Sequence, residues 1–320
     1  MTIYFAGTKR DAVEGGTGVT TTNTYYDPNY SNVAVVVSGT VTGGYTLPTE
    51  IGSNGGFWVA FTHYSYATGT TWGDHLLTLL DQSNNICAQI YRSNDDYMLR
   101  VYNSSNSYAN SLLFEWAPNQ LVRYDINVYT ENNVCYAKCY RNNLLMAGAQ
   151  LAGVNRGLKA FQVFKGAGNG SFGTTAGYVS EIIIADEPTL GMRVKTYRPT
   201  ADGTHTTWEG TFDNVNNDDV GIDAISTQLP NAAETFLHGQ TLNEGTAIRA
   251  IAIGAAIASN NPADASAVLN IGGTLYQKTF EKPLTQGAAP NIAIYETNPA
   301  TGVSFTAADF NSLEFGVQHA

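Results

Sequence analysis

Hydrophobic and polar residues alternate along most of this chain, and this period of two is the feature that most limits its fold. In a β-strand successive side chains point to opposite faces, so alternation indicates strands with one buried face. Turns rich in Asn, Gly and Asp separate the alternating segments. Many short strands at this spacing are typical of a β-sandwich or jelly roll. In the first half we expect strands at residues 57–61, 86–91, 99–102, 124–129, 134–140 and 179–184.

The second half is also mostly β, with more alanine. A helix is the alternative for the Ala-rich residues 248–258. Thr306 can cap a short helix over residues 307–313, with Asp309 near the positive end of its dipole. We therefore predict an all-β chain of two β-sandwich (jelly-roll) domains, with one short helix near the C-terminus. Expected strands here lie at residues 248–253, 267–271, 274–280, 291–295 and 314–317.

The length of the chain predicts two domains, and an interruption of the strand alternation predicts the boundary between them. A chain of 320 residues is long enough for two domains. Residues 185–191 end a strand, contain Pro188 and precede a further strand-like segment. We predict a jelly-roll domain at residues 1–187 and a second β-sandwich domain at residues 188–320.

The expected surface is polar but poor in charge. Asp, Glu, Lys and Arg make up 13% of the chain, against about 25% in typical soluble proteins. A net charge of −11 with only 16 Lys and Arg does not suit phosphate neutralisation, so we expect no nucleic-acid partner. The sequence shows no secretory signal and no apolar run of the ~20 residues that membrane insertion needs. We therefore expect folding in a cytoplasm, without membrane insertion.

The residue patterns do not indicate an enzyme. There is no Gly-x-Ser-x-Gly motif, and the histidines are scattered. His63 is expected on a solvated sheet face. Glycoside hydrolysis needs two carboxylates facing one sugar, whereas Glu181 and Glu115 each stand alone and are expected to face solvent. We predict no catalytic residue.

No cofactor is predicted, although one acidic segment is a weak candidate for calcium binding. Its carboxylates offer oxygen ligands at short spacing: Asp213, Asp218, Asp219 and Asp223. The segment lacks the Gly and the closing Glu of an EF-hand loop, so an Asx-rich turn without metal is favoured. The three cysteines are expected to be small buried hydrophobes rather than a disulfide or zinc site: Cys87, Cys135 and Cys139.

Aromatic residues cluster in loop-like sequence rich in Thr and Asn. Loops that display Tyr with Asn, Ser and Gly are typical of recognition surfaces. A sugar platform is one interpretation. Packing of the rings onto a sheet edge or into an oligomer interface is the favoured alternative. The candidate contact residues are Tyr25, Tyr26, Tyr30, Tyr64, Tyr66 and Trp72.

Several segments resemble a known superfamily. Residues 56–61, 76–81, 123–129 and 179–187 resemble the concanavalin-A-like/laminin-G superfamily as it occurs in phage structural proteins. Residues 295–317 are similar to the closing motif of tailed-phage structural proteins. The resemblance implies a jelly roll in the first half and carries over no functional residue.

The resemblance implies a non-enzymatic structural protein located in the virion of a tailed bacteriophage, as a tail or fibre component in assembly or host adhesion. A capsid decoration protein on the outer head is the alternative, and a glycan-binding lectin-like module is a further one. The expected partners are other copies of this chain and other virion proteins, with a host surface glycan as a further candidate. A charge-poor, Tyr-rich surface favours a homo-oligomer, because burying it costs little desolvation.

Overall fold

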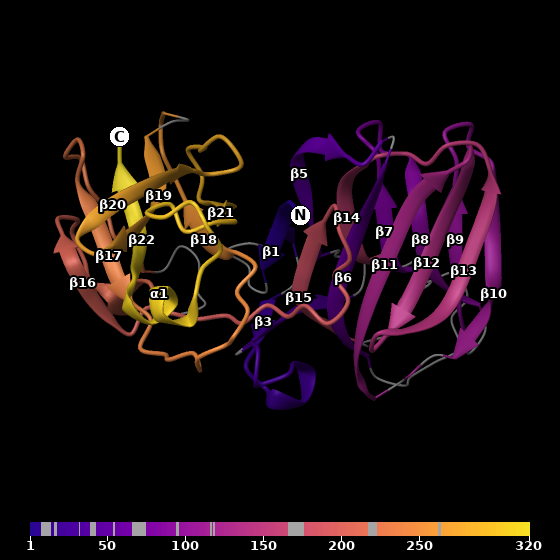
Figure 1. Cartoon of the computed structure of the whole chain (residues 1–320), viewed down its shortest axis with the longest axis horizontal. Helices are drawn as coiled ribbons and strands as arrows, with labels where there is room; N and C mark the ends of the chain where they lie inside the picture. The colour runs from indigo at the N-terminus through magenta and orange to yellow at the C-terminus, as the bar shows by residue number, and fades with distance from the viewer. Residues whose placement is uncertain are drawn as a thin grey trace. The chain divides into compact units, whose positions relative to one another are not determined.

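The computed structural model of the chain divides into two compact units, Met1–Thr196 (unit 1) and Tyr197–Ala320 (unit 2). Both are built almost wholly from antiparallel strands (Figure 1), which confirms the predicted all-β class. Residues 188–196, which the sequence prediction places in the second domain, belong to unit 1 in this division. The structure describes all residues except 8–13, 16–17, 32, 39–42, 54, 66–74, 94–95, 116, 118, 166–175, 217–222 and 262–263.

Unit 1 contains two antiparallel sheets. Sheet A has the strand order β13-β12-β11-β6-β15-β4-β3, with β1 paired to β15. Sheet B has the order β10-β9-β8-β7-β14-β5-β2. The strands of sheet A are β1 Ile3–Gly7, β3 Gly18–Thr20, β4 Ala34–Ser38, β6 Gly56–Ser65, β11 Leu121–Glu131, β12 Val134–Arg141, β13 Leu144–Ala152 and β15 Ala176–Ala185. Those of sheet B are β2 Glu14–Gly15, β5 Gly43–Ile51, β7 His75–Leu80, β8 Ile86–Ser93, β9 Asp96–Tyr102, β10 Tyr108–Glu115 and β14 Leu158–Lys165.

Alternation directs one side of each strand into the core of unit 1. On β9, for example, Tyr97, Leu99 and Val101 are buried while the residues between them are partly exposed. The three cysteines are buried and free, as the sequence predicts. His63 was expected on a solvated face, and this prediction is wrong. It lies two residues from buried Phe61 on β6 and is itself only 3% exposed, and its burial lowers its pKa to about 3.

Unit 2 is also antiparallel. Its five-stranded sheet has the order β16-β17-β22-β19-β20, and β18 and β21 form a separate two-stranded sheet. The strands are β16 Ala201–Thr206, β17 Ala233–Leu237, β18 Ile251–Ile257, β19 Ala265–Ile271, β20 Thr274–Thr279, β21 Ala289–Tyr295 and β22 Glu314–His319. Among the described residues, the helices are α1 Ala307–Ser312 and the 3-10 turns η1 Asn23–Tyr25 and η2 Phe212–Asn214.

The Ala-rich segment and the predicted C-terminal helix of unit 2 form a strand and a helix, respectively. The Ala-rich segment forms strand β18 rather than the alternative helix, and it pairs along its length with β21. The predicted helix is confirmed as α1. Thr306 accepts a hydrogen bond from the Asp309 backbone N–H at 3.1 Å, and the Asp309 carboxylate accepts from the Thr306 N–H at 2.7 Å. Among the described residues, no helix is both long and apolar enough to cross a membrane.

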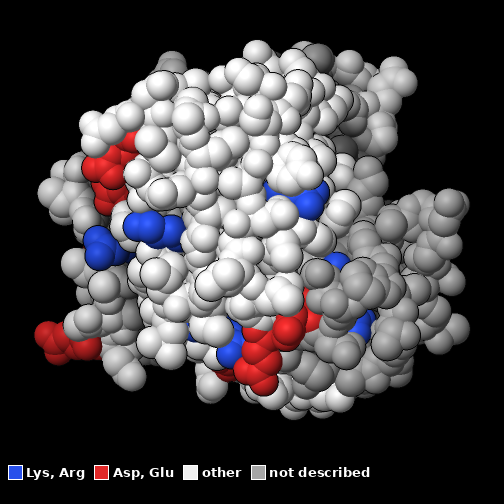
Figure 2. Space-filling view, turned by 90° about the vertical axis from the view of Figure 1, so that its right-hand side faces the viewer, with Lys and Arg blue, Asp and Glu red and all other residues white. Residues whose placement is uncertain are grey.

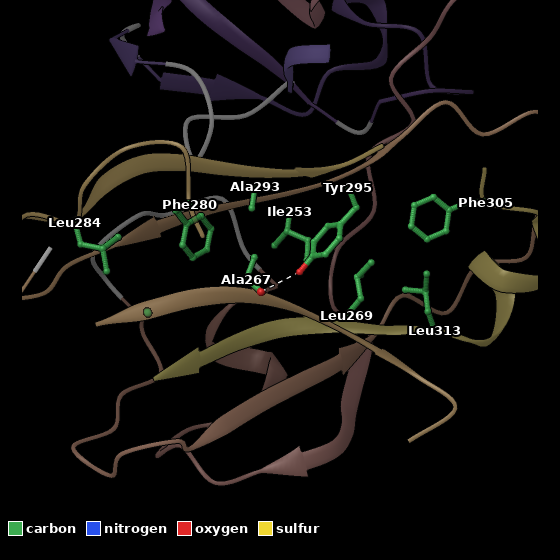
Figure 3. Close-up of a cluster of buried hydrophobic side chains, with 10 residues drawn as sticks. Ile253, Ala267, Leu269, Phe280, Leu284, Ala293, Tyr295, Phe305 and Leu313 are labelled. Carbon is green, nitrogen blue, oxygen red and sulfur yellow. Dashed lines mark hydrogen bonds between the residues drawn. The ribbon is translucent and has the colours of Figure 1, made fainter. Parts of the chain in front are cut away.

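The core of unit 2 lies between its two sheets (Figure 3). Leu269 from β19 is fully buried and Ile253 from β18 nearly so. Tyr295 extends from β21 into this core, where burial raises the pKa of its phenol. Its hydroxyl lies 3.0 Å from the Ala267 carbonyl oxygen and 2.8 Å from that of Tyr276. The buried phenol therefore keeps a hydrogen-bond partner.

Substitution of Leu269 by alanine tests this core. We expect Leu269→Ala to lower the free energy of unfolding of unit 2 by about 2–5 kcal/mol, since it removes buried methyl groups and leaves a cavity. Val303→Ala is the matched control because Val303 is 62% exposed, and it should change stability by no more than about 0.5 kcal/mol. Denaturant unfolding of the whole protein measures both. Equal effects of the two variants would contradict the assignment of the core.

Candidate binding surfaces

Of the predicted aromatic contact residues, Tyr25 and Tyr64 meet on the outer face of sheet A. Tyr66 and Trp72 lie outside the described residues. The Tyr25 ring stacks on Tyr178 of β15, with ring centres 3.8 Å apart and planes at 3°. It also meets the edge of Tyr64 on β6 at 5.1 Å. Tyr25 is therefore packed onto the sheet.

The neighbouring residues of this loop are held in the same way. Tyr26 is buried, and its hydroxyl donates to the Thr21 carbonyl oxygen at 3.0 Å. The ring of Tyr30 packs against the Arg193 guanidinium, whose carbon lies 3.6 Å from the ring centre. The described rings of this loop thus pack against the protein itself and do not project as a free platform for a sugar.

Arg193 joins the loop to sheet A through two carboxylates. Its Nε and Nη2 donate to the two carboxylate oxygens of Glu181 at 2.6 and 2.7 Å, and Nη2 also donates to Asp27 at 2.9 Å. Glu181 has no solvent exposure, so the expectation that it faces solvent is wrong. A β-bulge between Ser180 and Ile183 breaks the alternation of β15 at this residue, whose φ is +52°.

A second pair of charges lies beside this cluster on β11. Arg123 Nε is 3.5 Å from an Asp125 carboxylate oxygen, and the Thr189 hydroxyl donates to the other oxygen at 2.6 Å. Burial raises the pKa of Asp125 and lowers that of Arg123. Thr189 and Arg193 thus attach residues 186–196, the closing segment of unit 1, to the outer face of sheet A.

Removal of the Arg193 guanidinium tests the cluster. We expect Arg193→Met to lower the free energy of unfolding of unit 1 by about 3–5 kcal/mol, because it leaves the buried Glu181 carboxylate without its cation. Arg141→Met is the matched control, since Arg141 pairs with the 78%-exposed Glu115 side chain at 3.4 Å. Its effect should not exceed about 1 kcal/mol. Thermal unfolding followed by circular dichroism compares them, and similar melting temperatures would contradict a stabilising role for the cluster.

A different cluster occupies the outward positions of strands β8, β9 and β10 of sheet B. Arg100 is central, with its guanidinium carbon 4.5 Å from the ring centre of Tyr91 and 4.3 Å from that of Tyr108. Its Nε donates to the Asn110 side-chain oxygen at 2.8 Å. Its Nη1 and Nη2 donate to the hydroxyls of Tyr102 and Tyr91 at 3.3 and 2.9 Å. We call these five residues the arginine–tyrosine cluster.

The arginine–tyrosine cluster is open to solvent on one side. Tyr108 is 55% exposed and Asn110 is exposed, while Arg100 is half-buried. Burial alone would lower the pKa of Arg100, but the hydrogen bonds and charges of Tyr102 and Tyr91 raise it. The site therefore presents a permanent cation and aromatic rings whose positions are fixed before any ligand arrives.

These five residues were not predicted as a site from the sequence. The predicted strand at residues 99–102 does place Arg100 and Tyr102 on one face, because they are two residues apart. Tyr91 and Tyr108 join them only through pairing, in which β9 lies between β8 and β10. An arginine flanked by outward tyrosines on consecutive hairpins is the signal that could have found the cluster.

Unit 1 also exposes leucines at one edge. β10 and β13 are the outermost strands of sheets B and A, and they lie side by side (Figure 1). Figure 2 shows the molecule from this side, where neutral residues cover most of the described surface. The exposed side chains, which we call the leucine edge, are Leu112 (89%), Leu113 (46%), Leu144 (70%) and Leu145 (57%).

The structure brings no metal site together among the residues that it describes, where no three His, Cys, Asp or Glu are placed to hold an ion. Asp213 accepts a hydrogen bond from the Asn216 amide at 3.3 Å. Of the other calcium candidates, Asp223 is described, whereas Asp218 and Asp219 lie outside the described residues. Calcium binding there stays a prediction.

Comparison with known proteins gives only distant likeness. No family model and no curated protein matches the chain. Among solved structures, it is similar to the "Cellulose induced protein, Cip1", with 10% identity, a TM-score of 0.40 and coverage of 56% of this chain and 93% of that one. It is also similar to the receptor binding domain of botulinum neurotoxin D, with 11% identity and a TM-score of 0.41. That match covers 58% of this chain and 49%, about half, of the other. A third similar structure is the "Binding domain of Botulinum Neurotoxin DC in complex with SialylT", with 9% identity, a TM-score of 0.42 and coverage of 98% of each chain. These TM-scores are too low to assign a ligand to this chain.

Proposed function

We propose that this protein is a non-enzymatic adhesion component of a tailed-phage virion, and that it binds a host surface glycan at the arginine–tyrosine cluster. The observation that carries the glycan proposal is the Arg100 guanidinium held between Tyr91 and Tyr108 on a solvent-facing sheet. The virion assignment rests on the sequence resemblance of residues 56–187 and 295–317 to phage structural proteins.

The chemistry of the arginine–tyrosine cluster suits a sugar. The faces of sugar rings carry C–H groups that pack against aromatic rings, while their hydroxyls need directed hydrogen bonds. Tyr108 supplies an exposed ring, and the amide of Asn110 and the guanidinium of Arg100 supply donors beside it. Their mutual contacts fix the side chains in advance, which reduces the entropy lost on binding.

Burial of the carboxylates supports a non-enzymatic role. Glu181 is one of the two lone carboxylates that the sequence offers for hydrolysis, and both its oxygens are bound by Arg193. Asp125 is equally inaccessible. General acid or base catalysis needs a group within reach of the substrate. Neither Glu181 nor Asp125 has a carboxylate that a substrate could reach.

Truncation of the exposed ring tests glycan binding. We expect Tyr108→Ala to weaken binding of the best ligand from a bacterial surface glycan array about tenfold, since it removes the stacking surface. Tyr136→Ala is the matched control, because Tyr136 stacks on Tyr129 on the outer face of sheet A. It should bind as the unchanged protein does. Isothermal titration measures both, and an equal loss in the two variants would contradict the position of the site.

The leucine edge supports a role in repeated copies. The two outermost strands expose four large apolar side chains, and exposed apolar side chains at a sheet edge are available for protein contacts. Both strands at this edge are terminal strands, whose free backbone groups can pair with another chain. We therefore propose that copies of this protein associate through the leucine edge, in the tail or, as the alternative, on the outer head.

Charged substitutions at the leucine edge test this association. We expect the protein to be oligomeric in solution, and Leu112→Lys with Leu144→Lys to convert it to a monomer, because two like charges would face their copies across the contact. Val303→Lys places the same charge on an exposed residue of unit 2 and should leave the oligomer intact. Light scattering determines the mass of each, and antibody labelling of intact particles locates the protein. A strictly monomeric protein absent from virions would refute both the association and the virion assignment.

A further inference from the structure

Among the described residues, Arg100 has no anionic partner, unlike several other arginines of unit 1. Four other arginines of unit 1 pair with carboxylates: Arg123 with Asp125, Arg141 with Glu115, Arg156 with Asp81, and Arg193 with Asp27 and Glu181. Arg100 makes no ion pair with any described Asp or Glu, and its contacts are rings, phenol hydroxyls and one amide oxygen. Because these contacts are all uncharged, the positive charge of this half-buried guanidinium is available to pair with an external anion.

The contacts of Arg100 also fix the orientation of its guanidinium. The rings of Tyr91 and Tyr108 lie close to the group, and hydrogen bonds to Asn110, Tyr102 and Tyr91 define its rotation. Each terminal nitrogen uses one N–H in these bonds and carries a second N–H that they leave for a ligand. Two N–H groups on one planar fork match the two oxygens of a carboxylate.

We propose that the glycan bound at the arginine–tyrosine cluster is acidic, and that Arg100 binds the carboxylate of a uronic or sialic acid residue while Tyr108 stacks on the sugar. This inference rests on the proposed function and adds the chemical class of its ligand. A carboxylate is preferred to a phosphate because its planar pair of oxygens fits one guanidinium edge. A neutral sugar would leave the charge of Arg100 without a partner.

The experiment uses the full chain and matched pairs of glycans. An array carries uronic-acid and sialic-acid oligosaccharides, each beside its methyl ester, which keeps the sugar and removes the charge. Phosphorylated and neutral bacterial glycans complete the array. We expect acidic glycans to bind at least about tenfold more tightly than their methyl esters, as is typical for a charge-assisted bidentate contact.

Variants of Arg100 separate its fork from its charge. Arg100→Lys keeps a cation but has no planar fork, and it should lose most of the preference for acid over ester. Arg100→Gln should lose the whole preference. Arg141→Gln removes an arginine that is already paired with Glu115 and should bind as the unchanged protein does. Thermal unfolding of each variant verifies that it is folded, and Arg100→Lys, as the conservative change, keeps the test valid if Arg100→Gln is unstable.

Each result has a distinct meaning. Preference for acidic glycans that depends on Arg100 but not on Arg141 supports the inference. Equal binding of acids and esters, lost in Tyr108→Ala, overturns the acidic class and leaves glycan binding intact. Preference for phosphorylated glycans also overturns the carboxylate assignment. Binding of no glycan at all overturns both this inference and the proposed glycan function.

Discussion

The ion pair between Arg193 and Glu181 holds the closing segment of unit 1 against the outer face of sheet A. Glu181 is fully buried, and a buried carboxylate without a cation would be very costly. Arg193 supplies the cation only because the closing segment lies across the outer face of sheet A, and it holds Asp27 and Tyr30 at the same point. That part of sheet A is therefore covered by the protein's own chain. On the outer face of sheet B, by contrast, Tyr108 and Asn110 are exposed.

About half of the described strands and the helix could be predicted from the sequence, since regular alternation and the Thr306–Asp309 cap are local signals. Glu181 could not be placed, because alternation gives the face of a residue only while the strand is regular, and a β-bulge interrupts β15 there. The closing segment shows a related limit. Pro188 indicates that pairing stops, but the sequence does not show that the following residues pack back onto sheet A through Thr189 and Arg193.

The candidate site was missed for a reason that lies in strand β10. Its alternation is broken by a register shift between Asn110 and Leu113, so the sequence offered no strand there. Without β10, Tyr108 and Asn110 had no predicted neighbours, and Arg100 remained one outward residue among many. The aromatic loop residues attracted attention instead because they are dense in sequence. Their density reflects packing, since Tyr25 covers Tyr178 and Tyr64.

The separation of inward and outward positions on β8, β9 and β10 has an evolutionary consequence. Leu99 and Val101 face the core, whereas Arg100 and Tyr102 face outward from the same strand. Outward residues can therefore be exchanged during descent with little effect on folding. Under the proposed function, a lineage that meets a host with altered surface glycans could change the specificity of this face through a few point mutations, without altering the core of the sandwich.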